Sequence, residues 1–383
     1  MTNRRVVAHC LAGHRPQPFI SDQARGLRSF DPIVLARDRI DISTWGNTPI
    51  YASQTSPGWS DASLSEPGSS FNDVSSIFLD ALERHHVHLM HAHHGMFALE
   101  FLALRRLTSL PLIVSFYGFD ISGFPLSSPA NAQRLQRLFD DASLVLAMSE
   151  HMRRDLIEWG CHTNRIALHL PAVDINRFSY RSTWQTSATA TVRILSVSDF
   201  TPKKGTIDLI QAFAMVHSDF PATRLHLVGK PITTALTNYE ETRRQIRRLS
   251  LDDWVIMSGW NQYNQQSELY AQHDIFVLPS KVAADGSKEG VPAVILEAMA
   301  TGLPVVSTWH AGIPEVVVDG VTGILVAEGD VPALADAIST IVAKPHHRAA
   351  MGATGRTRVE EHFTVQVQRA RLERFYRMVL NRE

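Results

Sequence analysis

The chain has 383 residues, of which 44% are hydrophobic and 20% are charged, and its formal net charge is −1. A chain of this length is expected to form two domains, each with its own core. The near-zero charge gives no general attraction to nucleic acid, so we expect no nucleic-acid partner. The two cysteines, Cys10 and Cys161, exclude a disulfide framework and fit a reducing cytoplasm.

The N-terminal residues lack the apolar run of a secretory signal. Arg4-Arg5 is followed only by Val6-Val7-Ala8 before His9, and no apolar stretch of the chain is long enough to span a bilayer. We therefore expect a cytoplasmic protein that is at most peripheral at the inner face of a membrane.

Short apolar strands alternate with helical patterns, which predicts parallel sheets with helices on both faces. Ser53–Ser70 is rich in Ser, Gly and Pro and is expected to be an exposed loop. Tyr180–Thr191 is expected to link two domains. The strands predicted in the first half are Arg5–Ala8, Pro32–Ala36, Val87–His91, Leu112–Phe116 and Leu144–Met148.

The second half repeats this pattern, with a helix over Ile207–His217 and a terminal helix over Arg369–Leu380. We predict two Rossmann-like, doubly wound domains, residues 1–180 and 190–365, with the ligand in a cleft between them. The strands predicted here are Val192–Val197, Arg224–Gly229, Val255–Gly259, Ile275–Pro279 and Val305–Ser307.

Glu289 and Glu297, with seven residues between them, are the most informative pair in the chain. Pro292 suits the first turn of a helix, Ala293–Ala300 has a helical pattern, and Gly302 would end it. Glu289 then precedes the helix and Glu297 lies inside it. Free N–H groups at the helix start, with the positive end of the dipole, would hold a diphosphate without a metal. One carboxylate is then available for sugar hydroxyls and the other for a ribose diol.

The stretch from Glu289 to Val306 resembles the retaining glycosyltransferases of family 4, which have the GT-B fold. The resemblance continues through His310 to Val326, with Gly312-Ile-Pro-Glu315 and Asp319-Gly320, and then Gly329-Asp330. It is strong over residues 190–365 and weaker towards the N-terminus. Glu-Gly-hydrophobic-Pro at its start is typical of the branch that builds bacterial exopolysaccharide, capsule or lipopolysaccharide. The alternative, two surface glutamates flanking an ordinary helix, does not account for the combined motifs.

This resemblance implies a retaining, metal-independent transfer of a sugar from a UDP- or GDP-sugar to a glycan or lipid-linked acceptor. The nucleotide sugar is then a substrate, and no cofactor or metal is expected. It also implies that the C-terminal helix, residues 366–383, returns to pack on the N-terminal domain. The alternative function is a degenerate GT-B protein that binds a nucleotide or a partner without turnover.

The same resemblance assigns the candidate site residues. Lys204 follows a strand and precedes a helix, where the family has a phosphate-binding lysine; the alternative is a solvated lysine. Lys203 beside it is expected to be solvated. The residues expected at the reaction are Glu289, Lys204, Asp120 and Tyr117, and those expected at the donor are Glu297, Gly290, Val291, Pro292, Ala293, Gly13, Arg15, Asp199 and Trp260.

Two of these positions depart from the family pattern. Asp199 stands where the family has an arginine, and an aspartate repels a diphosphate unless a cation such as Lys230 or Arg15 compensates. Tyr117 replaces a histidine and is a poor base near neutral pH. Asp120 keeps its family position, either on the acceptor side or as the cap of a turn.

The remaining candidates each have two interpretations. Gly13 permits close approach of the backbone to a ligand, and Arg15 either meets the phosphate or is simply exposed. Trp260 either stacks on the nucleotide base or is a half-buried core residue. His91-Ala-His93-His94 has no carboxylate or cysteine at ligand spacing, so no metal is expected. These histidines either line the acceptor cleft or make hydrogen bonds within a turn.

Overall fold

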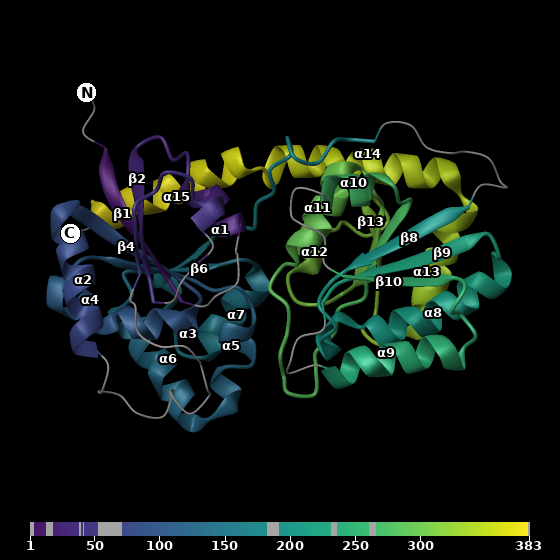
Figure 1. Ribbon diagram of the computed structural model, residues 1–383, viewed down its shortest axis with the longest axis horizontal. Helices are drawn as coiled ribbons and strands as arrows, with labels where there is room; N and C mark the ends of the chain where they lie inside the picture. Colours follow the sequence, from purple (N-terminus) through teal and green to yellow (C-terminus); the bar gives the residue numbers. More distant parts are fainter. Residues whose placement is uncertain are drawn as a thin grey trace. The chain divides into compact units, whose positions relative to one another are not determined.

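The computed structural model describes residues 4–12, 18–37, 40, 42–52, 71–181, 191–230, 236–259 and 266–381. The chain divides into two compact units. Unit 1 comprises Met1–Leu170 with Val365–Glu383, and unit 2 comprises Pro171–Thr364. Each unit is a parallel β-sheet covered by helices (Figure 1).

The sheet of unit 1 has seven strands in the order β3-β2-β1-β4-β5-β6-β7, and every neighbouring pair is parallel. The strand order reverses between β1 and β4, which makes the carboxyl ends of these strands the switch point where ligands bind in such sheets. The strands are β1 (Arg5–Leu11), β2 (Phe30–Ala36), β3 (Ile50–Ala52), β4 (Val87–His93), β5 (Leu112–Ser115), β6 (Leu144–Ala147) and β7 (Ile166–Leu168).

Two helices of unit 1 begin at serine caps. The Ser128 side chain accepts a hydrogen bond from Asn131 N at the start of α6, and Ser149 does the same for Met152 N in α7. The helices are α1 (Pro18–Ala24), η1 (Ile42–Thr44), α2 (Phe71–Arg84), α3 (Gly95–Ala98), η3 (Leu99–Phe101), α4 (Leu102–Thr108), α5 (Phe119–Ser122), η4 (Pro125–Ser127), α6 (Pro129–Asp141), α7 (Glu150–Glu158), η5 (Thr163–Arg165) and α15 (Val365–Leu380).

The C-terminal helix α15 completes the core of unit 1, as the resemblance implied (Figure 1). Leu372, Tyr376 and Val379 are buried against Val7 and Phe30 of the sheet. The rings of Phe30 and Tyr376 meet edge to face with centroids 5.1 Å apart. Burial of each large apolar side chain contributes about 1.5–3 kcal/mol, so removal of α15 would open this core to water.

The sheet of unit 2 has six strands in the order β10-β9-β8-β11-β12-β13, again parallel at every pair. Its order reverses between β8 and β11. The strands are β8 (Val192–Val197), β9 (Thr223–Val228), β10 (Val255–Ser258), β11 (Ile275–Leu278), β12 (Val305–Thr308) and β13 (Gly323–Val326). The helices are η6 (Pro202–Lys204), α8 (Thr206–Asp219), α9 (Leu236–Arg248), α10 (Gln266–Ala271), α11 (Ala293–Thr301), α12 (Ile313–Val316), α13 (Val331–Ala343) and α14 (Pro345–His362).

The predicted elements agree with the structure to within a few residues, with some differences. Pro292 is the N-cap of α11 rather than a residue of its first turn, with ψ of 117°, and the helix ends at Gly302 with φ of 92°. The first unit ends at Leu170, ten residues before the boundary drawn at 180 from sequence. Ser53–Ser70 and residues 182–190 of the expected linker lie outside the described residues.

Candidate active site

The candidate site of unit 2 lies at its switch point, where the segments after β8 and β11 meet. The segment after β8 contains Asp199 and the short helix η6, and the segment after β11 leads through Glu289 to α11. Gly205 joins η6 to α8 with φ of 66°, and a Cβ atom there would lie 1.9 Å from the carbonyl oxygen of Pro279. Glycine is therefore required for η6 to approach the end of β11 this closely.

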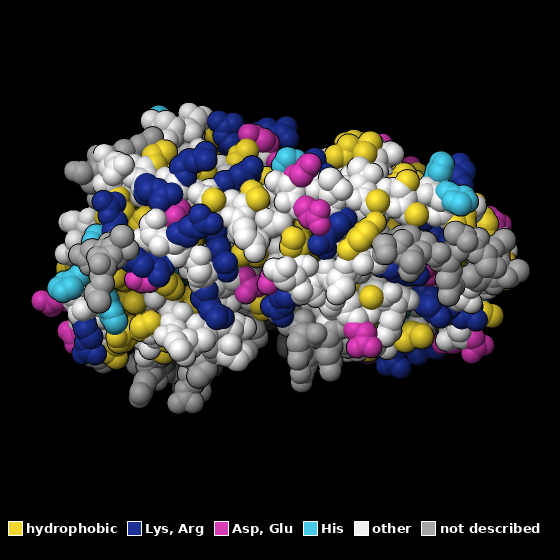
Figure 2. All heavy atoms as spheres, turned by 90° about the horizontal axis from the view of Figure 1, so that it is seen from above, with side chains coloured by type: hydrophobic (Ala, Val, Ile, Leu, Met, Phe, Trp, Pro, Cys, Tyr) yellow, Lys and Arg dark blue, Asp and Glu magenta, His cyan; other side chains and the backbone are white. Residues whose placement is uncertain are grey.

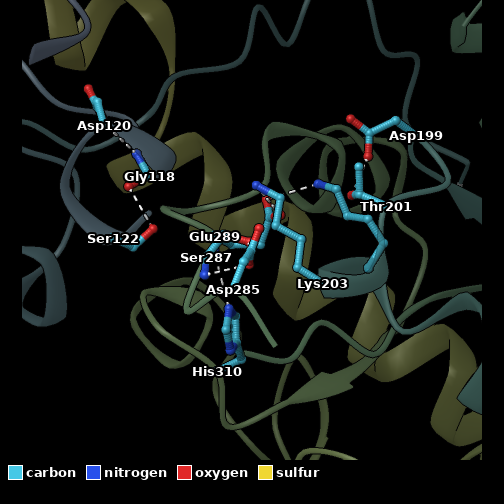
Figure 3. A network of polar contacts seen from close by, with 11 residues as sticks. Gly118, Asp120, Ser122, Asp199, Thr201, Lys203, Asp285, Ser287, Glu289 and His310 are labelled. Atoms are coloured by element: carbon cyan, nitrogen blue, oxygen red, sulfur yellow. Dashed lines mark hydrogen bonds and ion pairs between the residues drawn. The ribbon is translucent and has the colours of Figure 1, made fainter. Parts of the chain in front are cut away.

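This approach places the carboxylate of Glu289 between two lysines. Lys204 Nζ donates to Glu289 Oε2 at 2.9 Å, and Lys203 Nζ lies 3.1 Å from Oε1 (Figure 3). The Glu289 side chain is only 9% exposed. Burial alone would raise the pKa of Glu289, but Lys204 and Lys203 outweigh it and bring the pKa down to about 2. Glu289 is therefore ionised at neutral pH.

Lys203 corrects the prediction from sequence, which left it solvated. Both lysines belong to this site, and the Lys203 side chain is 20% exposed. Burial lowers the pKa of Lys204, but Glu289 and Asp199 more than offset it, so the net pKa is raised. Two ammonium groups thus converge on one carboxylate, an arrangement that also suits a diphosphate.

Asp199 is close enough to Lys204 for its negative charge to affect that lysine. Its Oδ1 accepts a hydrogen bond from the Thr201 hydroxyl at 2.7 Å, and its charge contributes to the raised pKa of Lys204. The acidic residue at the family's arginine position therefore has a hydroxyl donor of its own and supports the charge of Lys204. Of the two compensating cations expected from sequence, Lys230 is exposed and Arg15 lies outside the described residues.

The loop that carries Glu289 has a second support on its backbone side. Glu289 N donates to His310 Nε2 at 3.0 Å (Figure 3). His310 Nδ1 lies 2.6 Å from Glu328 Oε1. Val282 N donates to Glu328 Oε2 at 2.8 Å. Sequence reasoning assigned no role to His310 or Glu328, although His310 stands in the motif that carried the resemblance. Glu328 has no signal in the sequence, because its partner lies 18 residues away along the chain.

The residues Gly290 to Ala293 lead from Glu289 into α11. Gly312 N donates to Gly290 O at 3.2 Å, which ties this segment to the start of α12. Val291 is 5% exposed and packs inward. The start of α11 thus lies next to Glu289, as the spacing of the two glutamates predicted.

Glu297 lies inside α11 with its side chain buried. Tyr270 donates its hydroxyl to Glu297 Oε2 at 2.7 Å. Burial raises the pKa of Glu297 to about 7, although the Tyr270 hydroxyl and the charge of Arg177 both act to lower it. One carboxylate oxygen is therefore already bonded within the protein, and near neutral pH Glu297 changes between its acid and carboxylate forms.

In unit 1, Asp120 has the contacts of a turn cap. Its carboxylate accepts a hydrogen bond from Gly118 N at 2.9 Å (Figure 3). It also accepts from Gly95 N at 2.9 Å and from Tyr117 N at 3.0 Å. The Asp120 side chain is 1% exposed. These bonds hold the segment between β5 and α5, where Gly118 has φ of 144°. The geometry matches the capping alternative rather than a carboxylate free to meet an acceptor.

Tyr117 belongs to a buried chain of hydrogen bonds. Its hydroxyl lies 2.7 Å from His93 Nδ1, and His93 Nε2 lies 3.0 Å from His9 Nδ1. Burial raises the pKa of Tyr117 well above its ordinary value, so it stays protonated. The Tyr117 hydroxyl is therefore hydrogen-bonded to the His93 imidazole. Through His93 and His9 it is connected to β4 and β1 at the switch point of unit 1.

The histidines of β1 and β4 form one cluster. His9, His91 and His93 are each at most 1% exposed, and one ring nitrogen from each lies within 4.8 Å of the others. His91 lies between Tyr376 OH at 2.7 Å and Ser115 Oγ at 2.8 Å. Burial lowers the pKa of His9 to about 3 and those of His91 and His93 well below 6.5, so all three are neutral. Sequence reasoning found His91 and His93 but missed His9, which is far away along the chain.

Three further residues expected at the donor, Gly13, Arg15 and Trp260, lie outside the described residues.

Sequence comparisons identify two families along the chain. The profile described as "Glycosyl transferases group 1" matches residues 185–358, and the profile described as "Glycosyl transferase 4-like domain" matches residues 6–171. Together they cover most of both units.

Several curated proteins are similar. WcaL of Salmonella typhimurium, named for colanic acid biosynthesis, is 34% identical over 247 residues, which are 64% of this chain and 59% of WcaL. AmsK of Erwinia amylovora, an amylovoran biosynthesis glycosyltransferase, is 32% identical over 58% of this chain and 53% of AmsK. The chain thus matches little more than half the length of these two. A GDP-mannose-dependent phosphatidylinositol monomannoside mannosyltransferase of Corynebacterium glutamicum is 31% identical over 68% of both chains.

Solved structures share the fold. Anabaena Alr3699/HepE, crystallised with UDP and glucose, superposes with a TM-score of 0.79 at 20% identity and covers 98% of this chain and 100% of its own. Sucrose-phosphate synthase of Thermosynechococcus elongatus gives a TM-score of 0.80 at 19% identity, with 99% and 100% covered. With its two parallel-sheet units and these relatives, the chain belongs to the GT4-type glycosyltransferase family, described as glycosyl transferases group 1, and has the GT-B fold.

Proposed function

We propose that the chain is a retaining, metal-independent glycosyltransferase that moves a sugar from a UDP- or GDP-sugar to a glycan or lipid-linked acceptor in cell-surface polysaccharide synthesis. The observation that carries this proposal is the Lys203–Glu289–Lys204 group at the switch point of unit 2. The names of WcaL and AmsK support the polysaccharide pathway, and the solved complexes of HepE support a nucleotide-sugar donor.

The chemistry follows from the charges of the group. As the bond from sugar to diphosphate breaks, negative charge grows on the leaving phosphate, and fixed cations stabilise that charge. Lys203 and Lys204 supply two positive charges there, together with the N-terminal end of α11. These groups do the work that a divalent cation does in other transferases.

Glu289 changes partners in this scheme. Without donor, its carboxylate is bonded to the two lysines. A diphosphate with more negative charge competes for the same ammonium groups and releases the carboxylate to accept hydroxyls of the sugar. The departing phosphate oxygen takes the proton of the acceptor hydroxyl on the same face of the sugar, so the anomeric configuration is retained and no protein base is needed. This route tolerates Tyr117 at the position of the family's histidine.

The acceptor and the membrane form a further part of the proposal. Figure 2 shows Lys and Arg side chains gathered over unit 1 on one face. Arg25, Arg28, Arg374 and Arg377 are exposed on α15 and on the turn after α1. No helix in the described parts of the chain is long and apolar enough to cross a membrane. We propose that this basic face holds the chain at anionic lipid near a lipid-linked acceptor, which co-sedimentation with anionic and neutral vesicles tests.

The second candidate function is a binder without turnover. Asp199 at the arginine position and the engaged hydroxyl of Tyr117 favour it. Both candidates predict binding of a nucleoside diphosphate, so binding alone does not separate them. Release of UDP or GDP from a donor does.

The test is Glu289→Gln, assayed for UDP or GDP release across a panel of donors and acceptors. We expect kcat to fall by at least about 10²-fold, the effect of losing one oriented transition-state contact. Affinity for the free nucleoside diphosphate should stay the same or increase, because the variant no longer neutralises the two lysines. Lys204→Ala should instead weaken that affinity by about 1.5–3 kcal/mol.

The matched control is Glu240→Gln, an exposed glutamate of α9, whose turnover should equal that of the wild type. Wild-type turnover in Glu289→Gln would remove the proposed role of this carboxylate. If the wild type binds the nucleoside diphosphate but releases no UDP or GDP from any sugar donor, binding without turnover is the correct function.

A further inference from the structure

The residues that follow three neighbouring strands of unit 2 meet at Glu289. β11 leads into the loop of Glu289, β12 is followed by His310, and β13 is followed by Glu328. Because the carboxyl ends of parallel strands meet at one edge of a sheet, residues far apart along the chain lie side by side there. The result is a relay from Glu328 through the His310 ring to the backbone of Glu289.

The partners fix the tautomer of His310. A backbone N–H only donates, so His310 Nε2 must accept from Glu289 N and carry no proton. The neutral ring then carries its proton on Nδ1, which donates to Glu328 Oε1 at 2.6 Å. His310 is 0% exposed, so bulk water does not compete for the hydrogen bonds of its ring. A carboxylate that orients a histidine through Nδ1–H also sets the ring orientation.

Glu328 anchors the loop at two places. Its Oε1 accepts from the imidazole and its Oε2 accepts from Val282 N, so one carboxylate spans both ends of the loop between β11 and α11. Lys281 N also donates to Lys203 O at 2.8 Å, which links the loop to η6. These contacts therefore hold the loop where the Glu289 carboxylate reaches Lys203 and Lys204.

We propose that His310 and Glu328 form a positioning pair, which acts through the backbone of Glu289 and holds its carboxylate at the place where the donor sugar binds. The pair does not touch the reacting atoms. The inference rests on the proposed function, since it concerns a residue of that same site.

Two amide variants separate the two bonds of the ring. In His310→Gln the side-chain oxygen reaches the position of Nε2 and still accepts from Glu289 N. In His310→Asn the shorter amide reaches only the position of Nδ1 and keeps the bond to Glu328. We expect kcat of the Gln variant to stay within about 10-fold of the wild type and that of the Asn variant to fall about 10²-fold, the range seen when an orienting partner is lost. Affinity for UDP or GDP should change little in either.

The matched controls are His273→Gln and His273→Asn. His273 is also a buried histidine of unit 2, and its Nδ1 bonds to Leu269 O. Both controls should keep wild-type kcat. If His310 served only to fill space, the Gln and Asn variants would lose kcat equally and in step with their melting temperatures, and that result would overturn the inference.

A second measurement does not depend on turnover. In protein labelled with ¹⁵N-histidine, the signals of His310, assigned by their loss in His310→Gln, should show an unprotonated Nε2 and a protonated Nδ1. Glu328→Gln keeps one acceptor oxygen for two donors, His310 Nδ1–H and Val282 N–H, so the loop loses one of its two anchors and kcat should fall. A wild-type His310 protonated at Nε2 would contradict the positioning role while leaving the proposed function intact. A wild type with the expected tautomer but no turnover would sink the proposed function and, with it, the positioning role.

Discussion

At the scale of single residues, we expect Glu297 to make donor binding depend on pH. Its pKa of about 7 results from burial, offset by the hydroxyl of Tyr270. We expect the carboxylate form to bind the ribose diol, so affinity for a nucleotide donor should fall as pH drops below about 7. In Tyr270→Phe the carboxylate loses a donor, its pKa rises further, and the fall in affinity should begin at a higher pH.

The measurement is the dissociation constant of one nucleotide from about pH 5.5 to about pH 8.5 in both proteins. Titration of the nucleotide itself is the same in both and cancels in the comparison. Tyr239→Phe, which changes a partly buried tyrosine that packs on Phe200, is the control and should reproduce the wild-type curve. Superimposable curves for the wild type and Tyr270→Phe would exclude a ribose contact through an ionised Glu297.

The position of a site residue was predictable where the family resemblance assigns it. The contact of Lys204 with Glu289 joins residues 85 positions apart, and the resemblance placed both at one site. Lys203 was assigned to solvent because only the η6 turn decides that both adjacent lysines point the same way. Asp120 has the family position, but its three backbone donors come partly from Gly95 on another element. No local pattern shows such a donor.

At the scale of elements, the junction of η6 and α8 decides whether the lysines reach Glu289. Gly205→Ala combines φ of 66° with a Cβ atom 1.9 Å from Pro279 O, so the junction must move. We expect a loss of about 1–3 kcal/mol in the free energy of unfolding and weaker binding of the nucleoside diphosphate. Gly320→Ala is the control, because it has φ of 71° with nothing within 4 Å of the new Cβ atom.

The comparison of the two variants separates strain from displacement. Both carry the cost of a left-handed residue, so both should lower the melting temperature in thermal denaturation. Only Gly205→Ala should also weaken UDP or GDP binding in calorimetry. Equal affinities in the two variants would show that the closeness of η6 to β11 does not position the lysines.

The strands that sequence missed share one property. β3, β7 and β13 each lie at an edge of a sheet. They have three or four residues, and their side chains are partly or alternately exposed, whereas central strands such as β5 and β11 are continuous buried runs. A central parallel strand is buried on both faces and appears in the sequence as an apolar run, but a short edge strand is defined by its pairing. These three edge strands were therefore missed, whereas β10, the remaining edge strand, was predicted from the run Val255–Gly259.

At the scale of the whole molecule, the return of α15 to unit 1 was also beyond local patterns. Glu373 of α15 is 5% exposed and accepts from the backbone N–H groups of Arg28 and of Ser29, the latter at 3.0 Å. These partners lie more than 300 residues earlier in the chain. A helix with mixed charged and apolar residues fits many surfaces, and only the family resemblance indicated which one it covers.

The buried histidines should make unit 1 sensitive to acid. Burial lowers the pKa of His9 to about 3 and of His169 to about 4, and those of His91 and His93 lie well below 6.5. The unfolded chain therefore binds more protons than the folded chain between about pH 6.5 and pH 4, so stability falls as pH drops through this window. At pH 5 each such histidine costs about 2 kcal/mol relative to neutral pH, against a typical total of about 5–15 kcal/mol.

Unit 2 should lose less over the same window. Burial lowers the pKa of His273 to about 4 and also lowers those of His217 and His226, and all three act in the same direction as the histidines of unit 1. Glu297, with a raised pKa of about 7, opposes them, because it makes unit 2 more stable as pH falls from 7 towards 4.5. Hydrogen exchange at pH 7 and pH 5, corrected for the intrinsic rates, should therefore show greater loss of protection in β1 and β4 than in β8 and β11.

His9→Gln keeps an amide beside His93 but no longer titrates, so the fall in its unfolding free energy between pH 7 and pH 5 should be smaller than in the wild type. His162→Gln, which changes an exposed histidine of unit 1, should leave that fall unchanged. Equal pH dependence in His9→Gln and the wild type would mean that the pKa of His9 is not lowered in the folded chain.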